Sequence, residues 1–394
     1  MKKDWTYKKL GEVLVVERGG SPRPIQAYLT TDPNGLNWIK IGDAVEGSKY
    51  ITSTKEKIKP EGLHKTRFVN KGDFILSNSM SFGRPYILDI DGCIHDGWLV
   101  LRDKENVFDK SFLYYYLSSP NVYNEFKRLA VGGVVNNLNS ELVRGVTLPI
   151  PPISIQESIV RELDAIHGIL EKKQEQLREL DNLAQAIFYD MFGDPITNPK
   201  QWEVKKLGEL FDIGSSKRVY QSEWTTSGVP FYRAREVVKL SRDGYVDNEL
   251  FIKEELYDKY AEKYGTPKVG DILVTAVGTL GVTYIVKEKD RFYYKDGNII
   301  CLHHKGAAVE SKYVDFCFKT PFVREQIDNW NGATVGTFTI VKANTTILPL
   351  PPLSLQQSFA AKVSAIEAQK QAITQSIQHT EALLAQRMDN YFGI

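Results

Sequence analysis

The most regular pattern along the chain is a spacing of apolar residues that alternates between four and three positions, the heptad signature of a coiled coil. Nine of ten such positions are apolar in one stretch that reaches Met191, and seven of ten in another that reaches Tyr391. Five unbroken heptads exceed an ordinary amphipathic helix packed on its own globule, which is the alternative interpretation. We therefore expect two long helices whose shared seam comprises Ile159, Leu163, Ile166, Leu170, Leu177, Leu180 and Ile187 in the first and Phe359, Val363, Ile366, Ile373, Ile377 and Leu384 in the second.

Almost the same eleven residues precede each helical stretch: LPIPPISIQES at 148–158 and LPLPPLSLQQS at 348–358. The Pro-Pro pair ends an extended segment, because proline fixes φ and lacks a backbone N–H. Ser154 with Glu157, and Ser354 with Gln357, have the spacing of a capping box, in which two side chains satisfy free backbone N–H groups at a helix start. Both helices are expected to begin at this phrase.

The segments before the two helices also resemble each other, so the whole chain is a tandem repeat. WTYKKLGEV from Trp5 recurs as WEVKKLGEL from Trp202, and the pair Gly72-Asp73 recurs as Gly270-Asp271. Short apolar runs bounded by Gly, Asp and Asn indicate strands, and longer periodic runs that end near a proline indicate helices. The fold class expected is α+β, with two similar globules at 1–150 and 196–350 and two helical segments at 151–195 and 351–394.

The order of these segments predicts the direction of the helices. The second globule begins at Trp202, just after the first helical stretch ends near Gly193. If the two ends of each globule are neighbours, as is common in domains, the second helix must run back along the first. The expected architecture is a pseudo-two-fold tandem repeat in which an antiparallel coiled coil separates the globules by roughly 55 Å, at about 1.5 Å per helical residue.

Composition narrows the class of protein. No apolar run approaches the roughly 18 residues of a membrane span, so we expect a cytoplasmic protein. Three cysteines without a C-x-x-C spacing argue against a disulfide framework or a zinc ribbon. The net charge is only +1, which argues against a simple nucleic-acid coat. Residues 151–195 hold 4 Lys/Arg against 9 Asp/Glu, so the first helix is an acidic candidate docking face.

Signatures of catalysis are missing from the sequence. The chain has no G-x-x-x-x-G-K-[ST], H-E-x-x-H, G-x-S-x-G or G-x-G-x-x-G motif. His303 and His304 are adjacent in an expected strand, and neighbours on a strand point to opposite faces, so one metal cannot easily take both. We therefore expect no catalytic residue and no metal site on this chain.

Basic and small polar residues gather instead in matching loops of the two globules. Arginine and lysine suit phosphates and guanine edges, while Asn, Ser and Thr suit base edges. For any one of these residues, an ordinary solvated surface position is the alternative. The candidate DNA-binding residues are Arg23, Lys40, Asn78, Ser79, Ser81, Arg84, Asn136 and Asn137 in the first copy and Lys217, Arg218, Arg233, Arg235, Thr275, Thr279, Thr334 and Thr337 in the second.

The chain closely resembles the specificity (S) subunits of type I restriction-modification enzymes. The resemblance is carried by the duplicated Leu-Pro-x-Pro-Pro-x-x-x-Gln phrase, the repeated KKLGE starts, GSPRP with WIKIGD, and the helix ends FYDMFGD and MDNYFGI. It covers essentially the whole sequence. It implies two target recognition domains that each read one half of a bipartite double-stranded DNA site, with the coiled coil setting the spacer.

The resemblance also implies partner subunits. Two methyltransferase subunits would use S-adenosylmethionine to methylate adenine, and motor-nuclease subunits would use ATP and Mg²⁺. None of these cofactors, and none of this chemistry, is then expected on the present chain.

Two other functions remain open from the residues alone. A two-headed protein-binding scaffold would fit the modest net charge. An enzyme with an unfamiliar site is the second possibility. DNA binding whose affinity falls with salt would distinguish the expected function from the first, and methylation only after partner subunits are added would distinguish it from the second.

Overall fold

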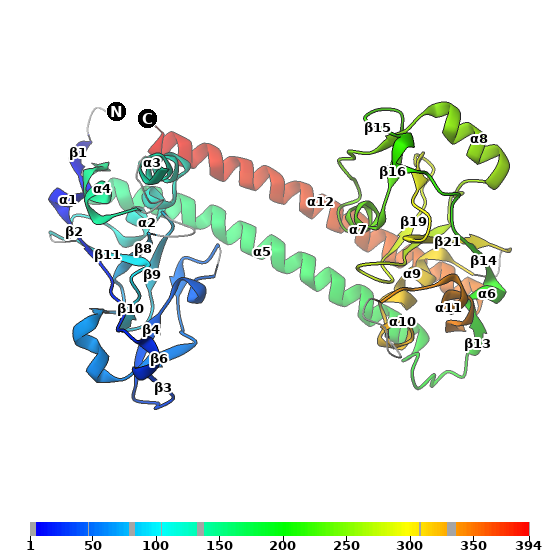
Figure 1. The fold of residues 1–394 in the computed structure, drawn as a ribbon, viewed down its shortest axis with the longest axis horizontal. Helices are drawn as coiled ribbons and strands as arrows, with labels where there is room; N and C mark the ends of the chain where they lie inside the picture. Colours follow the sequence, from blue (N-terminus) through cyan, green and yellow to red (C-terminus); the bar gives the residue numbers. More distant parts are fainter. Residues whose placement is uncertain are drawn as a thin grey trace. The chain divides into compact units, whose positions relative to one another are not determined.

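The contacts of the chain divide it into two compact units. The computed structural model describes residues 5–45, 47–78, 83–103, 105–131, 138–306, 309–328 and 336–393. Unit 1 consists of Met1–Glu175 with Thr374–Ile394, and unit 2 consists of Gln176–Ile373. The sequence suggested four segments, but the contacts group each globule with part of both long helices (Figure 1).

Unit 1 contains two sheets of five described strands each and one two-stranded pair. The first sheet has the order β2 (Leu14–Arg18), β11 (Trp98–Asp103), β8 (Phe74–Ser77), β9 (Pro85–Leu88) and β5 (Tyr50–Ile51). The second has the order β3 (Leu29–Thr30), β6 (Glu56–Ile58), β4 (Leu36–Ile39), β10 (Gly92–Ile94) and β7 (Arg67–Val69). Its helices are α1 (Leu10–Val13), α2 (Lys110–Ser118), α3 (Pro120–Val131) and α4 (Ser140–Gly145), with the 3₁₀ turns η1 (Ile25–Ala27), η2 (Ile41–Asp43) and η3 (Pro60–Lys65).

Unit 2 repeats this plan with four described strands in each sheet. One sheet has the order β14 (Phe211–Gly214), β21 (Ile299–His304), β18 (Ile272–Thr275) and β19 (Thr283–Ile285), and the other β15 (Trp224–Thr225), β17 (Phe251–Ile252), β16 (Val229–Tyr232) and β20 (Tyr293–Tyr294). Its helices are α6 (Leu207–Leu210), α7 (Ala234–Asp243), α8 (Glu254–Tyr264), α9 (Ser311–Lys319), α10 (Pro321–Asp328) and α11 (Ile340–Thr345), with the 3₁₀ turn η4 (Gln221–Glu223). The helix α7 follows β16, where unit 1 has only the 3₁₀ turn η2 after β4, and it packs on β18 and β19.

A two-stranded antiparallel pair joins the ends of each globule. In unit 1, β1 (Thr6–Lys9) pairs with β12 (Thr147–Ile150), with Thr6 opposite Ile150. In unit 2, β13 (Glu203–Lys206) pairs with β22 (Ile347–Leu350) in the same way. The neighbouring ends on which the predicted helix direction depended are therefore present in both copies.

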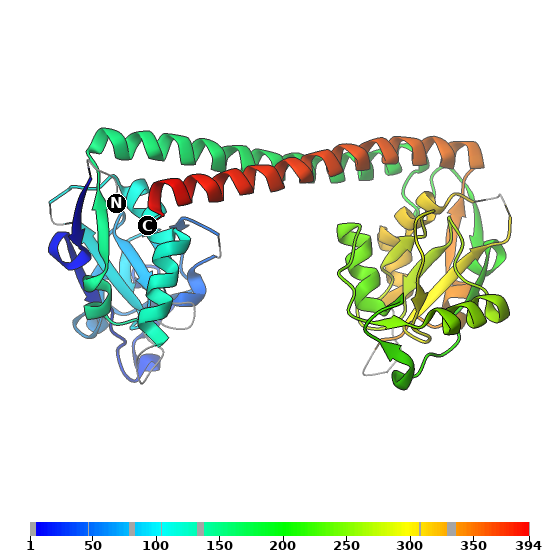
Figure 2. The same ribbon diagram turned by 90° about the horizontal axis from the view of Figure 1, so that it is seen from above.

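The two long helices, α5 (Ile153–Phe192) and α12 (Leu353–Phe392), run antiparallel within each unit (Figure 2). In unit 1, Glu162 bonds Arg387 at 2.8 Å, and Lys173 Nζ donates to Thr380 Oγ1 at 2.7 Å. In unit 2, Lys370 Nζ donates to Asp181 Oδ1 at 2.5 Å. As the residue number increases along α5, the number of the contacting residue on α12 decreases, so the two helices are antiparallel, as predicted. Each helix is 40 residues long, or about 60 Å at 1.5 Å per residue.

The burial pattern of the two long helices follows the predicted seam positions and shifts by one residue near the helix ends. All the seam positions expected from the heptad are buried or half-buried. In the last turns, however, the buried side chains are Phe188 and Phe192 in α5 and Met388 and Phe392 in α12, one position beyond the heptad that reached Met191 and Tyr391. A straight α-helix has 3.6 residues per turn, so a 3.5-residue repeat drifts. At the helix ends the buried positions therefore have the 3.6-residue period of a straight helix. There the buried side chains pack in the globular cores.

The predicted capping box is wrong, and the glutamine beside it explains the duplicated phrase. The helix α5 begins at Ile153, so Ser154 is already helical, and the carbonyl of Pro152 accepts from Gln156 N at 3.1 Å. The side chain of Gln156 is fully buried. Its Oε1 accepts from Asp109 N at 2.8 Å, and its Nε2 donates to the carbonyls of Val107 and Pro151, both at 2.9 Å.

The same glutamine recurs in unit 2. Gln356 is also fully buried, accepts from Glu310 N at 2.9 Å and donates to the Pro351 carbonyl at 2.7 Å. Each glutamine satisfies backbone groups that water cannot reach, and so fixes the start of a long helix to its globule. None of the helices that the structure describes combines the length and apolar character needed to cross a membrane.

Candidate nucleic-acid interface

Each unit places one candidate arginine against an Asp-Gly pair that recurs in both copies. Arg23 follows β2, has a side chain that is 84 % exposed, and lies 3.8 Å from Asp96. Arg218 follows β14, has a side chain that is 65 % exposed, and donates from Nε to Asp296 Oδ2 at 2.8 Å. A guanidinium carries five donors, so one contact to a carboxylate restrains the group and leaves donors for a phosphate or a guanine edge.

The carboxylate of Asp96 is held in its ionised form. Ser21 Oγ donates to Asp96 Oδ1 at 2.8 Å, and His95 Nε2 lies 2.9 Å from the same oxygen. Burial alone raises the pKa of Asp96, but the hydrogen bond from Ser21 and the charges of His95 and Arg18 lower it overall. An ionised Asp96 can restrain Arg23 at neutral pH.

Sequence reasoning missed both aspartates, because a carboxylate repels phosphate and so was not a candidate for DNA binding. The available signal was the recurrence of Asp-Gly in HDGW and KDGN.

A second pair of equivalent positions lies at the end of β4 and of β16. The backbone N–H of Lys40 donates to Asp43 Oδ2 at 2.8 Å, and that of Arg233 donates to Glu236 Oε2 at 2.9 Å. The side chain of Lys40 pairs with Glu56 at 2.6 Å.

The two arginines of this site in unit 2 share a buried carboxylate. Arg233 Nη2 donates to Glu236 Oε1 at 2.8 Å, and Arg235 contacts the same carboxylate and also Glu249, at 2.7 Å. Burial alone raises the pKa of Glu236, but hydrogen bonds from both arginines lower it overall. The positive charge of the two arginines is therefore partly neutralised within the unit.

Two of the candidate residues, Asn78 in unit 1 and Thr275 in unit 2, are buried, and each forms hydrogen bonds at a turn of its own unit. Asn78 donates from Nδ2 to the Asp96 carbonyl at 3.0 Å, and Thr275 Oγ1 donates to the Thr279 carbonyl and accepts from Val282 N at 3.0 Å. Their burial speaks against direct base contacts and assigns both side chains to the scaffold. In unit 1, Ser77 Oγ matches Thr275 and accepts from Arg84 N at 3.0 Å.

The turn that follows Asn78 in unit 1 and the turn that follows Thr275 in unit 2 each contact the later candidate segment of the same unit. In unit 2, Val277 forms a bridge with Thr337, and Phe338 N donates to the Ala276 carbonyl at 2.9 Å. In unit 1, Leu138 N donates to the Asn78 carbonyl at 2.9 Å. Thr279 and Thr337 are exposed. Five further candidates lie outside the described residues: Ser79, Ser81, Asn136, Asn137 and Thr334.

Two lysine side chains of unit 2 lie near the ring of one tyrosine. The ammonium groups of Lys217 and Lys263 lie 5.6 and 5.5 Å from the ring centre of Tyr264, which is half exposed at the end of α8. Ring faces attract cations, so Tyr264 keeps two positive charges together. Of Lys217, Lys263 and Tyr264, only Lys217 was predicted from the sequence as a candidate DNA-binding residue.

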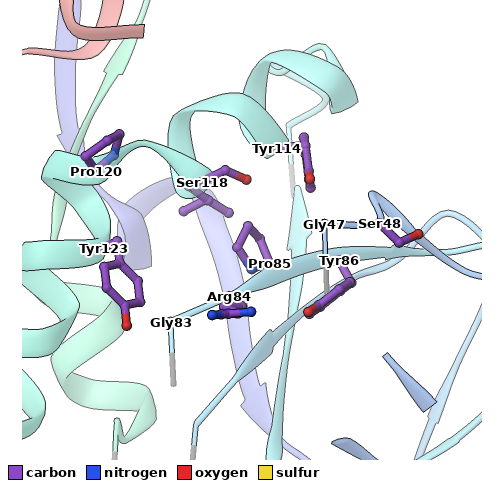
Figure 3. Close-up of a pocket in the computed structure, with 11 residues that line it drawn as sticks. Gly47, Ser48, Gly83, Arg84, Pro85, Tyr86, Tyr114, Ser118, Pro120 and Tyr123 are labelled. Atoms are coloured by element: carbon purple, nitrogen blue, oxygen red, sulfur yellow. The ribbon is translucent and has the colours of Figure 1, made fainter. Parts of the chain in front are cut away.

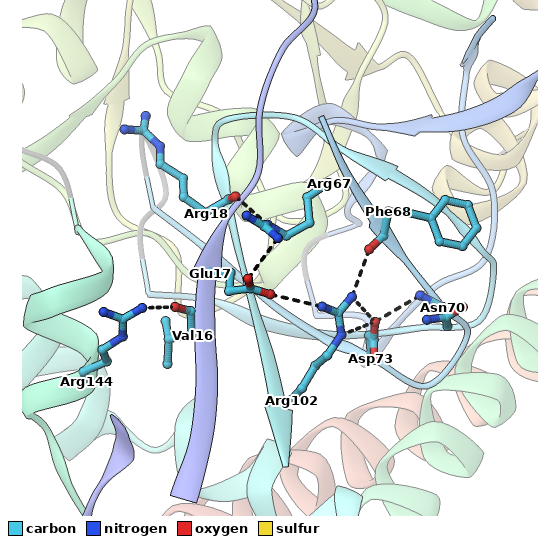
Figure 4. Close-up of polar contacts among 9 residues, drawn as sticks. All are labelled: Val16, Glu17, Arg18, Arg67, Phe68, Asn70, Asp73, Arg102 and Arg144. Carbon is cyan, nitrogen blue, oxygen red and sulfur yellow. Dashed lines mark hydrogen bonds and ion pairs between the residues drawn. The ribbon is translucent and has the colours of Figure 1, made fainter. Parts of the chain in front are cut away.

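Other arginines of unit 1 serve the scaffold (Figure 4). Arg102 Nη2 donates to Asp73 Oδ2 at 2.9 Å, and its Nη1 donates to Glu17 Oε2 at 3.3 Å. Arg67 bonds the other oxygen of Glu17 at 2.9 Å, and Arg144 donates to the Val16 carbonyl at 2.6 Å. Positive charge alone therefore does not mark a residue as a candidate for DNA binding.

Arg84 lines a pocket of about 410 Å³ in unit 1, between β9 and the helices α2 and α3 (Figure 3). Tyr86, Tyr114 and Tyr123 line it as well. At the matching place in unit 2, Lys319 bonds Asp315 at 2.6 Å and Thr283 bonds the same carboxylate. The two globules thus carry different chemistry at equivalent places, as expected if they recognise different structures.

Comparisons with known proteins agree with this arrangement. The family model described as type I restriction modification DNA specificity domain matches twice, at residues 2–180 and 199–381. A putative type I restriction enzyme specificity subunit of Haemophilus influenzae is 28 % identical over 79 % of this chain and 79 % of that protein. The MjaIX specificity subunit of Methanocaldococcus jannaschii is 24 % identical over 92 % of this chain and 86 % of that protein.

Solved structures share the fold. One, from work on complex assembly and conformational transition of the type I R-M system, has a TM-score of 0.60 at 18 % identity and covers 100 % of this chain and 98 % of that one. The S subunit of the type I restriction-modification system of M. genitalium has a TM-score of 0.52 at 15 % identity. The match covers 98 % of this chain and 97 % of that one.

Proposed function

Because the chain belongs to the type I restriction-modification DNA specificity family, we propose that it selects the DNA site for such a system, each globule binding one half of a bipartite sequence. The observation that carries this proposal is the duplicated placement of an exposed arginine on an Asp-Gly turn, Arg23 at Asp96 and Arg218 at Asp296. The side chains around the two turns differ, so the two halves of the site would differ in sequence.

Two globules on one chain provide the selectivity that one globule lacks. A good bidentate contact discriminates one base by about 1–3 kcal/mol, which is little against the many competing sites of a genome. When two binding modules are linked, the second binding step becomes intramolecular and succeeds only at a permitted spacing. The long helices α5 and α12 would set this spacing, because a continuous helix is stiffer than a loop.

The chemistry is proposed to reside on partner subunits. Two methyltransferase subunits with S-adenosylmethionine would dock on the helices, and motor-nuclease subunits would bring ATP and Mg²⁺. The acidic balance of residues 151–195 supports docking there, as do the exposed side chains of Ile169 and Leu183 on α5. Apolar side chains inside a charged surface are typical of protein interfaces.

Genome-wide mapping of adenine methylation tests this function. Cells that carry the chain and its methyltransferase partner should show one bipartite methylated sequence, and cells that lack the chain should lose it. A scaffold that binds only proteins would leave the methylation pattern unchanged. Retention of the full pattern without the chain would contradict the proposal.

Lengthening both helices should change the spacer. We expect that seven residues inserted after Leu177, with seven matching residues near Ile373, lengthen the pair by about 10 Å. At about 3.4 Å per base pair the methylated sequence should gain about three spacer positions while both half-sites stay the same. The control inserts seven glycine- and serine-rich residues after Tyr245, in the loop between α7 and β17 and outside both long helices. Methylation mapping gives the spacer, and an unchanged spacer in the lengthened variant would count against the measuring role.

Removing one exposed arginine should weaken DNA binding in a salt-dependent way. For Arg218→Ala in the complex with the methyltransferase, we expect about a tenfold loss of affinity and a decrease of about one in the slope of log K against log salt. Arg242→Ala is a matched control, because Arg242 is also exposed in unit 2 and pairs with Asp243 at 2.7 Å, but lies in none of the candidate loops. Fluorescence anisotropy at several salt concentrations measures both. Equal behaviour of the two variants would remove Arg218 from the interface.

A further inference from the structure

Unit 2 holds a cluster of three metal-ligating side chains that the proposed function does not use. One ligand atom each from Asp271, Cys301 and His303 lies within 4.8 Å of the others. His303 Nδ1 is 2.6 Å from Asp271 Oδ2 and 3.7 Å from Cys301 Sγ. Asp271 and Cys301 are buried, whereas the side chain of His303 is 37 % exposed, which leaves a path from solvent.

The sheet itself brings these residues together. Cys301 and His303 are two apart on β21, and alternate residues of a strand share one face. Asp271 precedes β18, which pairs with β21 so that Ile272 is opposite Leu302. His304 points to the other face and contacts the Gly270 carbonyl at 3.1 Å and Ser311 Oγ at 2.8 Å. The sequence argument that His303 and His304 cannot share an ion therefore holds, but it overlooked Cys301.

The corresponding place in unit 1 shows what the scaffold requires. There Asp73 bonds Arg102 at 2.9 Å (Figure 4). Val100 stands at the strand position that matches Cys301. Unit 2 keeps the carboxylate but has histidine where unit 1 has arginine and cysteine where unit 1 has valine. An arginine–aspartate pair is sufficient for this fold, so the thiol and the imidazole add ligand chemistry that the scaffold does not need.

We propose that Asp271, Cys301 and His303 bind one zinc ion, with water as the fourth ligand. Zinc takes sulfur, imidazole nitrogen and carboxylate oxygen in tetrahedral geometry, which separates neighbouring ligand atoms by roughly 3.5 Å. The distance of 3.7 Å between Cys301 Sγ and His303 Nδ1 already matches. The hydrogen bond of 2.6 Å between His303 and Asp271 opens slightly to admit the ion. Magnesium and calcium are excluded, because they prefer sites made only of oxygen.

The surrounding contacts prepare the ligands. Asp271 Oδ2 accepts from Lys268 N at 2.7 Å, which fixes the carboxylate and leaves it further lone pairs for a metal. Burial raises the pKa of the Cys301 thiol well above its ordinary value. The thiol proton therefore leaves to solvent as the sulfur–zinc bond forms, so zinc binding should strengthen as pH rises. Bound zinc would join β21 to the start of β18 and stabilise unit 2.

Cobalt(II) replaces zinc as a coloured probe for this site. The full-length chain, freed of metal by a chelator, is titrated with Co²⁺ and then with Zn²⁺. We expect one Co²⁺ per chain, a near-ultraviolet thiolate-to-cobalt charge-transfer band, and loss of this band when Zn²⁺ displaces Co²⁺. Zinc should also raise the melting temperature, because a ligand that binds only the folded state stabilises it.

The control variants come from the chain itself. Cys301→Val and His303→Arg introduce the residues of unit 1, so both should fold, as circular dichroism can verify, but bind zinc at least 100-fold more weakly. Cys317→Ala removes a different buried thiol of unit 2 and should bind normally. The proposal is overturned if the charge-transfer band is absent, or if the two variants bind zinc as tightly as the unaltered chain. Neither result depends on DNA binding, so the proposed function is tested separately.

Discussion

Replacing Gln156 with leucine is expected to lower the free energy of unfolding of unit 1 by about 3–5 kcal/mol, since a buried backbone group without a hydrogen bond costs about 1–3 kcal/mol. The leucine leaves the N–H of Asp109 and the carbonyls of Val107 and Pro151 without the glutamine. Urea unfolding followed by circular dichroism measures the loss. Hydrogen exchange at the Asp109 amide gives a local measurement, and exchange there should become faster.

Gln174→Leu is the matched control for this prediction. It makes the same change on the same helix at an exposed position, where substitutions usually alter stability by at most about 0.5 kcal/mol. The Glu310 amide of unit 2, which donates to Gln356, is an internal reference and should exchange as before. Similar unfolding curves for Gln156→Leu and Gln174→Leu would show that the buried glutamine does not hold the helix start.

Replacing Phe188 with alanine should destabilise unit 2 by about 3–5 kcal/mol, the usual cost of removing a buried phenylalanine. Phe188 is 1 % exposed, and its ring centre lies 5.6 Å from that of Phe359 and 5.9 Å from that of Tyr313. The side chain thus joins α5, α12 and α9 in one core. Urea unfolding monitored by tryptophan fluorescence measures the change.

The control for Phe188 lies five residues earlier on the same helix. Leu183 is 47 % exposed, so Leu183→Ala removes an apolar side chain without opening a core cavity. Its effect on the free energy of unfolding should stay within about 0.5 kcal/mol. If both variants lose the same stability, the packing of the helix end against the globule is not what stabilises unit 2.

The features that the sequence predicted are those with a local period. The spacing of Ile159, Leu163 and Ile166 predicted a buried helix face, because 3.5-residue periodicity is visible within the stretch itself. The tandem repeat predicted two globules of the same kind. The direction of the helices followed from chain order, and the β1–β12 pair supplies the physical reason.

The features that the sequence did not predict depend on contacts far along the chain. Gln156 was noted only as part of the duplicated phrase, because the partners of its side chain, Val107 and Asp109, are nearly 50 residues away. The role of Asp96 likewise depends on the fold, which places its carboxylate near the guanidinium of Arg23. Asn78 and Thr275 were proposed as base contacts from residue type alone, and their burial could not be inferred from that.

The pairing of the first and last strands of each globule has a consequence for how such a protein can change. In unit 1 the first and last strands of the globule place Thr6 opposite Ile150. In unit 2 the corresponding strands place Glu203 opposite Leu350. We therefore expect that a globule can be exchanged for another of the same fold through two junctions that lie next to each other. The stretches at 148–158 and 348–358 share seven of eleven residues, so we expect the second junction to tolerate exchange between the two copies.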